Sequence, residues 1–362
     1  MPTHLFPTGP LSPAARRRLV VAAGLSAGVA CASTSPTLPP STETLVVLNE
    51  GVGTLTILPI TVPGPPSTLT LGPTSVGPTG LLTLGPIAVV TSAEAKALDV
   101  LDLTFRRLER TILLEHAPGS GGLLNDSVAY IANPLANVVT QVNVLSGDTA
   151  SVAVGQAPVA LAVARGRIFV LNANVDPACE DPAACVLGAS WISVVDPERN
   201  IVTDSVGLPG PGNGSAITVG GDGQVYALSA GTAEEAGRLS VVDPVSRTEV
   251  GSFGGFGILP IALASDGRER LYVVSATGLM EFNTRTRRVV RGAASAIPLD
   301  RGREAAVDGN GLVYVVESGS CAYPLQGRIR VFRPDLTEAR VVTAGVCAAA
   351  AGLVRLPPVP FD

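Results

Sequence analysis

Short runs of apolar residues recur along the chain, separated by polar turns. In the stretch "AVGQAPVALAVARGRIFVLN", from Ala153 to Asn172, two such runs are separated only by the turn "ARG". Neither run is long enough for a typical helix, and apolar residues do not recur at the three-and-four spacing of a helix face. The pattern therefore predicts two adjacent β-strands that form a hairpin.

The second strand of this hairpin has seven copies along the chain. They begin near residues 45, 87, 129, 168, 225, 271 and 313, and most intervals are close to 42 residues. A third and a fourth strand-like run follow each copy. Four short strands in a period of about 42 residues are typical of propeller blades. We therefore expect an all-β fold over residues 44–357, a seven-bladed β-propeller of four-stranded antiparallel blades, with six or eight blades as alternatives.

The ends of the predicted ring explain a spare strand. The innermost strands read "ALAV", "AITV", "IALA" and "EAAV", and small residues suit the narrow space near the axis. The first unit lacks such a strand, whereas a run from Ala349 to Leu356 remains after the last unit. We expect this run to complete the first blade, so that the N- and C-terminal strands pair and leave no open edge.

Aspartates precede glycine in several turns between the first and second strands. We expect Asp222, Asp266 and Asp308 to cap their own turns. A calcium loop at Asp308 and Asn310 is the alternative, but the segment lacks further oxygen ligands at the expected spacing.

One unit, "VAYIANPLANVVTQVNVLSGDTASVAVGQAPVALAV", resembles the YVTN-type propeller repeat of lactonase-like and NHL-like proteins. The shared pattern is an aromatic strand, an Asn, a valine-rich strand, then V-G-x-x-P and a small-residue strand. It covers roughly residues 44–356 and is clearest in the third to fifth blades. The resemblance implies a propeller. Because some such propellers are lactonases, it also keeps a hydrolase among the candidate functions.

The N-terminal residues predict export. In "ARRRLVVAAGLSAGVAC", basic residues precede an apolar run that is too short to span a bilayer, which indicates a signal peptide over residues 1–30. "GVAC" resembles a bacterial lipobox, so we expect Cys31 to be lipidated and residues 31–43 to include a flexible tether. We expect residues 358–362 to be a C-terminal tail. The protein would then be anchored to a bacterial membrane, facing the periplasm or the cell exterior. An ordinary secretory signal is the alternative, and the choice between Sec and twin-arginine export stays open.

Four cysteines remain after Cys31, an even number in an exported chain. Cys179 and Cys185 lie in one insertion of the fourth blade, and Cys321 and Cys347 lie in connections of the seventh. In a four-stranded meander these connections emerge on one face. We therefore expect the disulfides Cys179–Cys185 and Cys321–Cys347. A four-cysteine zinc site is the alternative, although C-x-x-C spacing is missing.

Charge and residue type narrow the candidate chemistry. Removing residues 1–30 leaves 22 basic and 30 acidic residues, a net charge of −8, which disfavours nucleic-acid binding. The candidate binding residues are the one histidine of the mature chain, the one tryptophan, and three asparagines that each follow a predicted strand: His116, Trp191, Asn49, Asn133 and Asn172. For each of them a structural role is the alternative: solvent exposure for the histidine, blade packing for the tryptophan and turn formation for the asparagines.

These features favour a binding or scaffold module over an enzyme. We expect a monomer that binds an envelope protein or other surface component through a rigid disc of loops, without a cofactor or metal, and that contacts the membrane through its lipid anchor. A lactonase-like hydrolase and a purely structural envelope or surface-layer protein are the alternatives. A hydrolase would need a carboxylate cluster or a metal at the mouth of the central channel.

Overall fold

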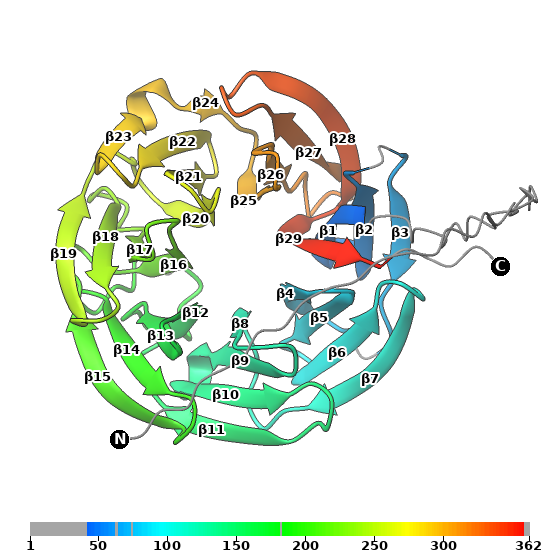
Figure 1. The fold of residues 1–362 in the computed structure, drawn as a ribbon, viewed down its shortest axis with the longest axis horizontal. Helices are drawn as coiled ribbons and strands as arrows, with labels where there is room; N and C mark the ends of the chain where they lie inside the picture. The colour runs from blue at the N-terminus through cyan, green and yellow to red at the C-terminus, as the bar shows by residue number, and fades with distance from the viewer. Residues whose placement is uncertain (1–41, 62–63, 74, 182, 358–362) are drawn as a thin grey trace, which may run out of the picture. The chain divides into compact units, whose positions relative to one another are not determined.

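The computed structural model describes residues 42–61, 64–73, 75–181 and 183–357. The predicted signal peptide, Cys31 and the C-terminal tail lie outside these residues. Seven antiparallel sheets are arranged as a ring around a central axis (Figure 1). The predicted all-β, seven-bladed propeller is confirmed.

Each blade has four strands, which we name a to d from the centre outward. In this order, blade 1 consists of β29 (Ala348–Leu356), β1 (Thr42–Asn49), β2 (Thr54–Pro59) and β3 (Ser67–Thr70), and blade 2 of β4 (Pro78–Leu84), β5 (Ile87–Ser92), β6 (Ala97–Asp102) and β7 (Arg107–Leu113). Blade 3 consists of β8 (Gly121–Leu123), β9 (Val128–Asn133), β10 (Val138–Asn143) and β11 (Thr149–Ala153), and blade 4 of β12 (Pro158–Ala164), β13 (Arg167–Asn172), β14 (Trp191–Asp196) and β15 (Ile201–Gly207). Blade 5 consists of β16 (Gly214–Val219), β17 (Val225–Ser229), β18 (Arg238–Asp243) and β19 (Thr248–Phe253), blade 6 of β20 (Pro260–Ser265), β21 (Arg270–Ser275), β22 (Gly278–Asn283) and β23 (Arg288–Arg291), and blade 7 of β25 (Gly302–Val307), β26 (Val313–Glu317), β27 (Gln326–Phe332) and β28 (Glu338–Val346).

Short elements lie between some of these strands. The 3-10 helices η1 (Glu50–Val52) and η2 (Pro134–Ala136) join strands b and c of blades 1 and 3. In blade 6, η3 (Ala293–Ser295) leads to β24 (Ile297–Pro298), which pairs with β22 beyond the end of β23. None of the helices in the described residues has the length and hydropathy needed to cross a membrane.

The ring closes where the two ends of the described chain meet. β29 pairs with β1 in an antiparallel ladder that runs from the pair Thr42 and Leu356 to the pair Asn49 and Ala348. The C-terminal strand is therefore strand a of blade 1, as the spare run of small residues predicted. Closure gives this blade the same four strands as the others and joins the two ends of the described chain in one sheet.

The core lies between neighbouring blades. Strand b is buried on both faces, which explains its continuous apolar sequence. Four of these strands bury a tyrosine at the same position, Tyr130, Tyr226, Tyr272 and Tyr314. Two of the hydroxyls donate hydrogen bonds to turn aspartates, from Tyr226 to Asp222 at 2.8 Å and from Tyr314 to Asp308 at 3.0 Å.

The predicted turn caps are present. The Oδ1 atom of Asp308 accepts hydrogen bonds from the backbone N–H groups of Asn310 and Leu312, both at 2.9 Å. Asp222 and Asp266 accept corresponding bonds from residues two positions later. Both oxygens of Asp308 are therefore used within its own hairpin, which explains why Asp recurs in these turns.

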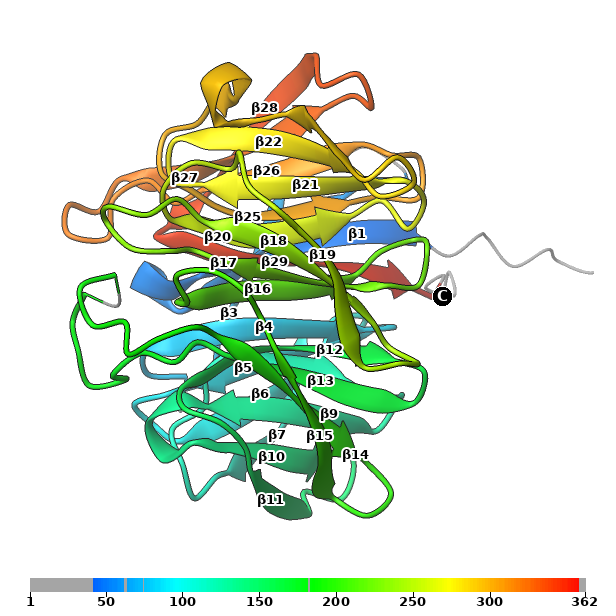
Figure 2. The same ribbon diagram turned by 90° about the vertical axis from the view of Figure 1, so that its left-hand side faces the viewer.

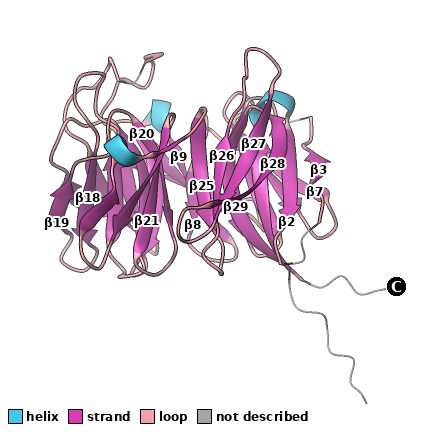
Figure 3. Cartoon of the chain, turned by 90° about the horizontal axis from the view of Figure 1, so that it is seen from above, coloured by secondary structure: helices cyan, strands magenta, loops and turns pink. Residues whose placement is uncertain are grey.

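The two faces of the ring differ in the length of their connections. The loop face carries the b–c and d–a connections, including residues 173–190, 254–259 and 318–325, whereas the turn face carries the short a–b and c–d turns. Figure 2 shows the long loops after β13 and β26 projecting on the same side, and Figure 3 shows that the 3-10 helices lie on this side as well. Strand β1 begins at Thr42 on the turn face and ends on the loop face.

Candidate functional site

Two disulfides brace the loop face. Cys179 pairs with Cys185 inside the blade 4 insertion, and Cys321 pairs with Cys347 across two connections beside blades 7 and 1. Both predicted pairings are confirmed. The base of the blade 4 insertion is further closed by a bridge between Val175 and Val186. The two disulfides are consistent with a protein that folds outside the cytoplasm.

Exposed apolar side chains gather on the same face. Its exposed large apolar residues are Val52, Val76, Leu135, Leu187, Ile258, Leu259, Tyr323 and Leu325. On the turn face, the corresponding residues among those described are Phe105, Leu145 and Val245. Tyr323 is 75% exposed and Leu187 is 63% exposed, and each lies in a loop that a disulfide restrains. The loop face thus presents apolar groups from several blades, and those of blades 4 and 7 lie in loops that a disulfide restrains.

The three candidate asparagines are fully buried at the ends of strands b in blades 1, 3 and 4. The Oδ1 atom of Asn49 accepts a hydrogen bond from the N–H of Gly345 at 2.9 Å, and Asn172 accepts one from Gly155 at the same distance. Each of these glycines lies at the connection from the preceding blade. The side-chain amides therefore join strand b to the chain that enters from the neighbouring blade.

Asn133 plays the same part with different partners. Its Nδ2 donates to the carbonyl oxygens of His116 at 3.4 Å and Ala117 at 3.2 Å, which lie in the d–a connection that leads into blade 3. Its Oδ1 accepts from the hydroxyl of Thr140 at 2.8 Å. The hydrogen bonds of this asparagine serve the same connection between blades.

His116 and Trp191 lie near two of these asparagines. The imidazole of His116 is partly exposed, and its Nε2 lies 3.9 Å from Glu115. Trp191 begins β14, and a β-carbon added to Gly155 would lie 2.3 Å from Cζ2 of its ring. The indole therefore covers the glycine whose N–H binds Asn172, which places it in the packing between blades 3 and 4.

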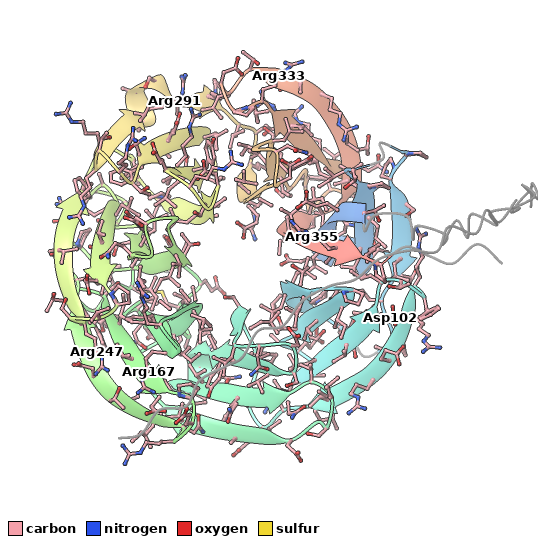
Figure 4. The ribbon with its side chains drawn as sticks, in the orientation of Figure 1. Asp102, Arg167, Arg247, Arg291, Arg333 and Arg355 are labelled. Carbon is pink, nitrogen blue, oxygen red and sulfur yellow. A yellow bond between two sulfur atoms is a disulfide. The ribbon has the colours of Figure 1, made fainter. Side chains whose placement is uncertain are left out.

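The central channel contains a feature that the repeat pattern did not reveal. In six blades the innermost strand has an irregularity in its pairing next to the end of strand b. In blade 7 this irregularity falls at Arg303, after which Glu304 pairs with Val316. Glu304 lines a channel cavity of about 220 Å³. The other lining residues belong to β8, β12, β16 and β20, and Ser120 lies in the connection just before β8. Figure 4 shows Arg247, Arg291 and Arg333 toward the outer rim, whereas Arg355 lies toward the centre.

The environment of Glu304 alters its acidity. Its burial in the channel wall raises the pKa of this carboxyl to about 7, although the N–H of Ala305 donates to Oε1 at 3.0 Å and the positive charge of Arg303 acts in the opposite direction. Glu50, in η1, also has a raised pKa because of burial, which Arg303 partly offsets. Among the described residues, no group of three or more His, Cys, Asp or Glu side chains is placed to hold a metal ion.

Sequence patterns could have identified part of this arrangement. Written one above another, the inner strands show Glu304 as the acidic residue in a column of small residues, although "EAAV" otherwise resembles the other small-residue strands. The apolar residues of the loop face have no comparable signal, because loops follow no regular hydrophobic period.

Comparison with known proteins supports the fold. No protein-family model matches the sequence, and no curated protein matches it. Among solved structures, the chain is similar to hydrazine synthase of Kuenenia stuttgartiensis, with a TM-score of 0.61 and 12% identity over 81% of this chain and 93% of that one. It is also similar to a streptogramin B lyase, with a TM-score of 0.57 and 13% identity, and to apo AztD of Citrobacter koseri, with a TM-score of 0.55 and 14% identity. Each of these two alignments covers 87% of this chain and 98% of the other.

Proposed function

We propose that this protein is an exported, membrane-anchored propeller whose loop face binds a protein of the cell envelope without chemical turnover. The observation that carries the proposal is the accumulation of exposed apolar side chains on the loop face, several of them in disulfide-braced loops. Exposed apolar patches mark interaction sites, because their burial removes apolar surface from water. A braced loop also loses less conformational entropy on binding than a flexible one.

The point at which the chain enters the propeller supports a loop face that is accessible to a partner. Thr42 begins β1 on the turn face, opposite the loop face. The 11 residues from Cys31 to Thr42 can span at most about 40 Å when fully extended. A lipid on Cys31 would therefore be attached through the turn face, and the loop face would be free of the attachment point and accessible to a partner.

The anchor is tested separately from the binding surface. Expressed in a bacterium that processes lipoproteins, the wild-type protein should partition with membranes, and Cys31→Ser should release it or leave it unprocessed. Recovery of intact, unlipidated wild-type protein in the soluble fraction would contradict lipid anchoring, and it would leave the loop-face interaction open to its own test.

The binding surface is tested by matched triple variants. One carries Leu187→Ser, Tyr323→Ser and Leu325→Ser on the loop face, and the control carries Phe105→Ser, Leu145→Ser and Val245→Ser on the turn face. All six side chains are exposed, so both variants should fold with the circular-dichroism spectrum and melting temperature of the wild type.

The two variants should differ in affinity for the envelope protein that copurifies with the wild-type chain. Burying an apolar side chain contributes roughly 1.5–3 kcal/mol. Removing three such groups should weaken binding by at least about 100-fold, since 1.4 kcal/mol corresponds to a factor of ten. The turn-face control should bind as the wild type does. Equal losses in both variants, or undiminished binding by the loop-face variant, would contradict the proposal.

A further inference from the structure

Glu304 occupies a position at which the other blades have very small residues. The position is defined by pairing with the penultimate residue of strand b, as Glu304 pairs with Val316. Its equivalents are Ala350, Gly80, Ser120, Ala160, Ala216 and Ala262. These small side chains leave open space near the axis, and blade 7 places a carboxyl group beside that space.

The cavity beside this carboxyl is otherwise uncharged. Its wall includes Ser120, Ala160, Ser215, Ala216, Ile261 and Ala262 in addition to Glu304, and the remaining lining residues are also uncharged. Arg303 precedes Glu304 on β25 and is exposed, and none of the ion pairs found among the described residues joins the two side chains. The cavity thus combines uncharged walls, built by the inner strands, with a single acidic group.

From this arrangement we infer that the channel binds a small organic cation, with an ammonium group on the Glu304 carboxylate and the rest of the molecule in the uncharged space beside it. An ionised carboxyl in such a wall is costly unless it is paired, and an ammonium ion supplies both the opposite charge and the hydrogen-bond donors. The rest of the lining carries no charge, so Glu304 would be the group that selects a cation, as a few placed polar groups determine specificity in ligand pockets. This site lies inside the channel, near its loop-face end, and its ligand does not depend on the proposed protein partner.

Two small ligands of similar size, one charged and one neutral, provide the test. n-Butylammonium and n-butanol have similar size and shape, and only the former carries a charge. We expect saturation-transfer NMR and titration calorimetry at pH 8 to show binding of n-butylammonium to the purified protein, with n-butanol at least tenfold weaker. Because the pKa of Glu304 is about 7, the amine should bind about 30-fold more weakly at pH 5.5, where most of the carboxyl is protonated.

Two variants complete the test. Glu304→Gln should abolish binding of the amine while retaining the fold, and Glu234→Gln, at an exposed loop glutamate, should bind it as the wild type does. The inference would be overturned by equal binding of the alcohol and the amine, by undiminished binding in Glu304→Gln, or by the absence of amine binding at pH 8. The pH dependence in the wild-type protein tests the same point without any substitution.

Discussion

Replacing Asn172 with alanine should destabilise the propeller by about 3 kcal/mol, because its buried amide joins two blades. The Oδ1 atom accepts from the N–H of Gly155 at 2.9 Å. The Nδ2 atom donates to the carbonyl oxygen of Trp191 at 3.2 Å and to the hydroxyl of Ser193 at 3.0 Å. Alanine would leave all three partners without these bonds.

The size of the effect follows from burial. Asn172 is 0% exposed and Ser193 is 4% exposed, so water cannot readily replace the lost amide there. A buried polar group without a partner costs about 1–3 kcal/mol, and Gly155 is only partly buried, so it regains part of its loss from water. A total near 3 kcal/mol corresponds to a fall in melting temperature of about 4–5 °C for a chain of this size.

Urea denaturation, followed by circular dichroism and by tryptophan fluorescence, measures this change. Trp191 is the only tryptophan of the chain and packs on Gly155, so its emission reports directly on the altered contact. Asn310→Ala, at an exposed turn position, is the matched control and should stay within about 0.5 kcal/mol of the wild type. A loss below 1 kcal/mol for Asn172→Ala, or a loss equal to that of the control, would refute the argument that this amide stabilises the contact between blades.

Three further predictions concern the disulfides and the titrating groups. Cys347→Ser should lower the free energy of unfolding more than Cys185→Ser, because the disulfide that closes the larger loop restrains the unfolded chain more. The losses should be at most about 3.6 and about 2.4 kcal/mol, and the reverse order in urea denaturation would contradict this. Burial raises the pKa of Tyr226, so the folded protein retains this proton longer than the unfolded chain and stability should fall as pH rises above about 10. Tyr226→Phe should reduce that slope in alkaline denaturation, and an unchanged slope would exclude Tyr226 as its source. Likewise, the free energy of unfolding of Glu304→Gln should exceed that of the wild type by up to about 3 kcal/mol at pH 8, and this advantage should disappear below about pH 4.5. A gain that does not depend on pH would show that burial of the charge is not the cause.

Much of the fold could be predicted because strand b has a distinctive sequence. It lies between two neighbouring strands of its own blade and is covered on both faces by adjacent blades, so its run is apolar throughout and recurs at the blade period. The spare run from Ala349 to Leu356 was identifiable because a ring leaves no strand without a partner. The cysteine pairs could be predicted from the expected export and from the face on which their connections emerge.

The candidate functional features depended on geometry that the repeat does not encode. The partners of Asn172 lie in a connection from another blade and in a neighbouring strand, so the sequence could suggest a turn residue but could not show the contact with Gly155. The sequence placed Glu304 on an inner strand, but the cavity and its uncharged walls appear only when strands from five blades meet. The apolar residues of the loop face lie far apart in the chain, and closure of the ring places them on one face.

Photo-crosslinking in living cells tests the proposed recognition surface most directly. A photoreactive amino acid would replace Tyr323 on the loop face in one strain and Phe105 on the turn face in another; both side chains are large and exposed. If the loop face binds an envelope protein, irradiation should yield a discrete crosslinked product from position 323 and none from position 105. A product from position 105 together with none from position 323 would contradict the assignment of the binding surface to the loop face.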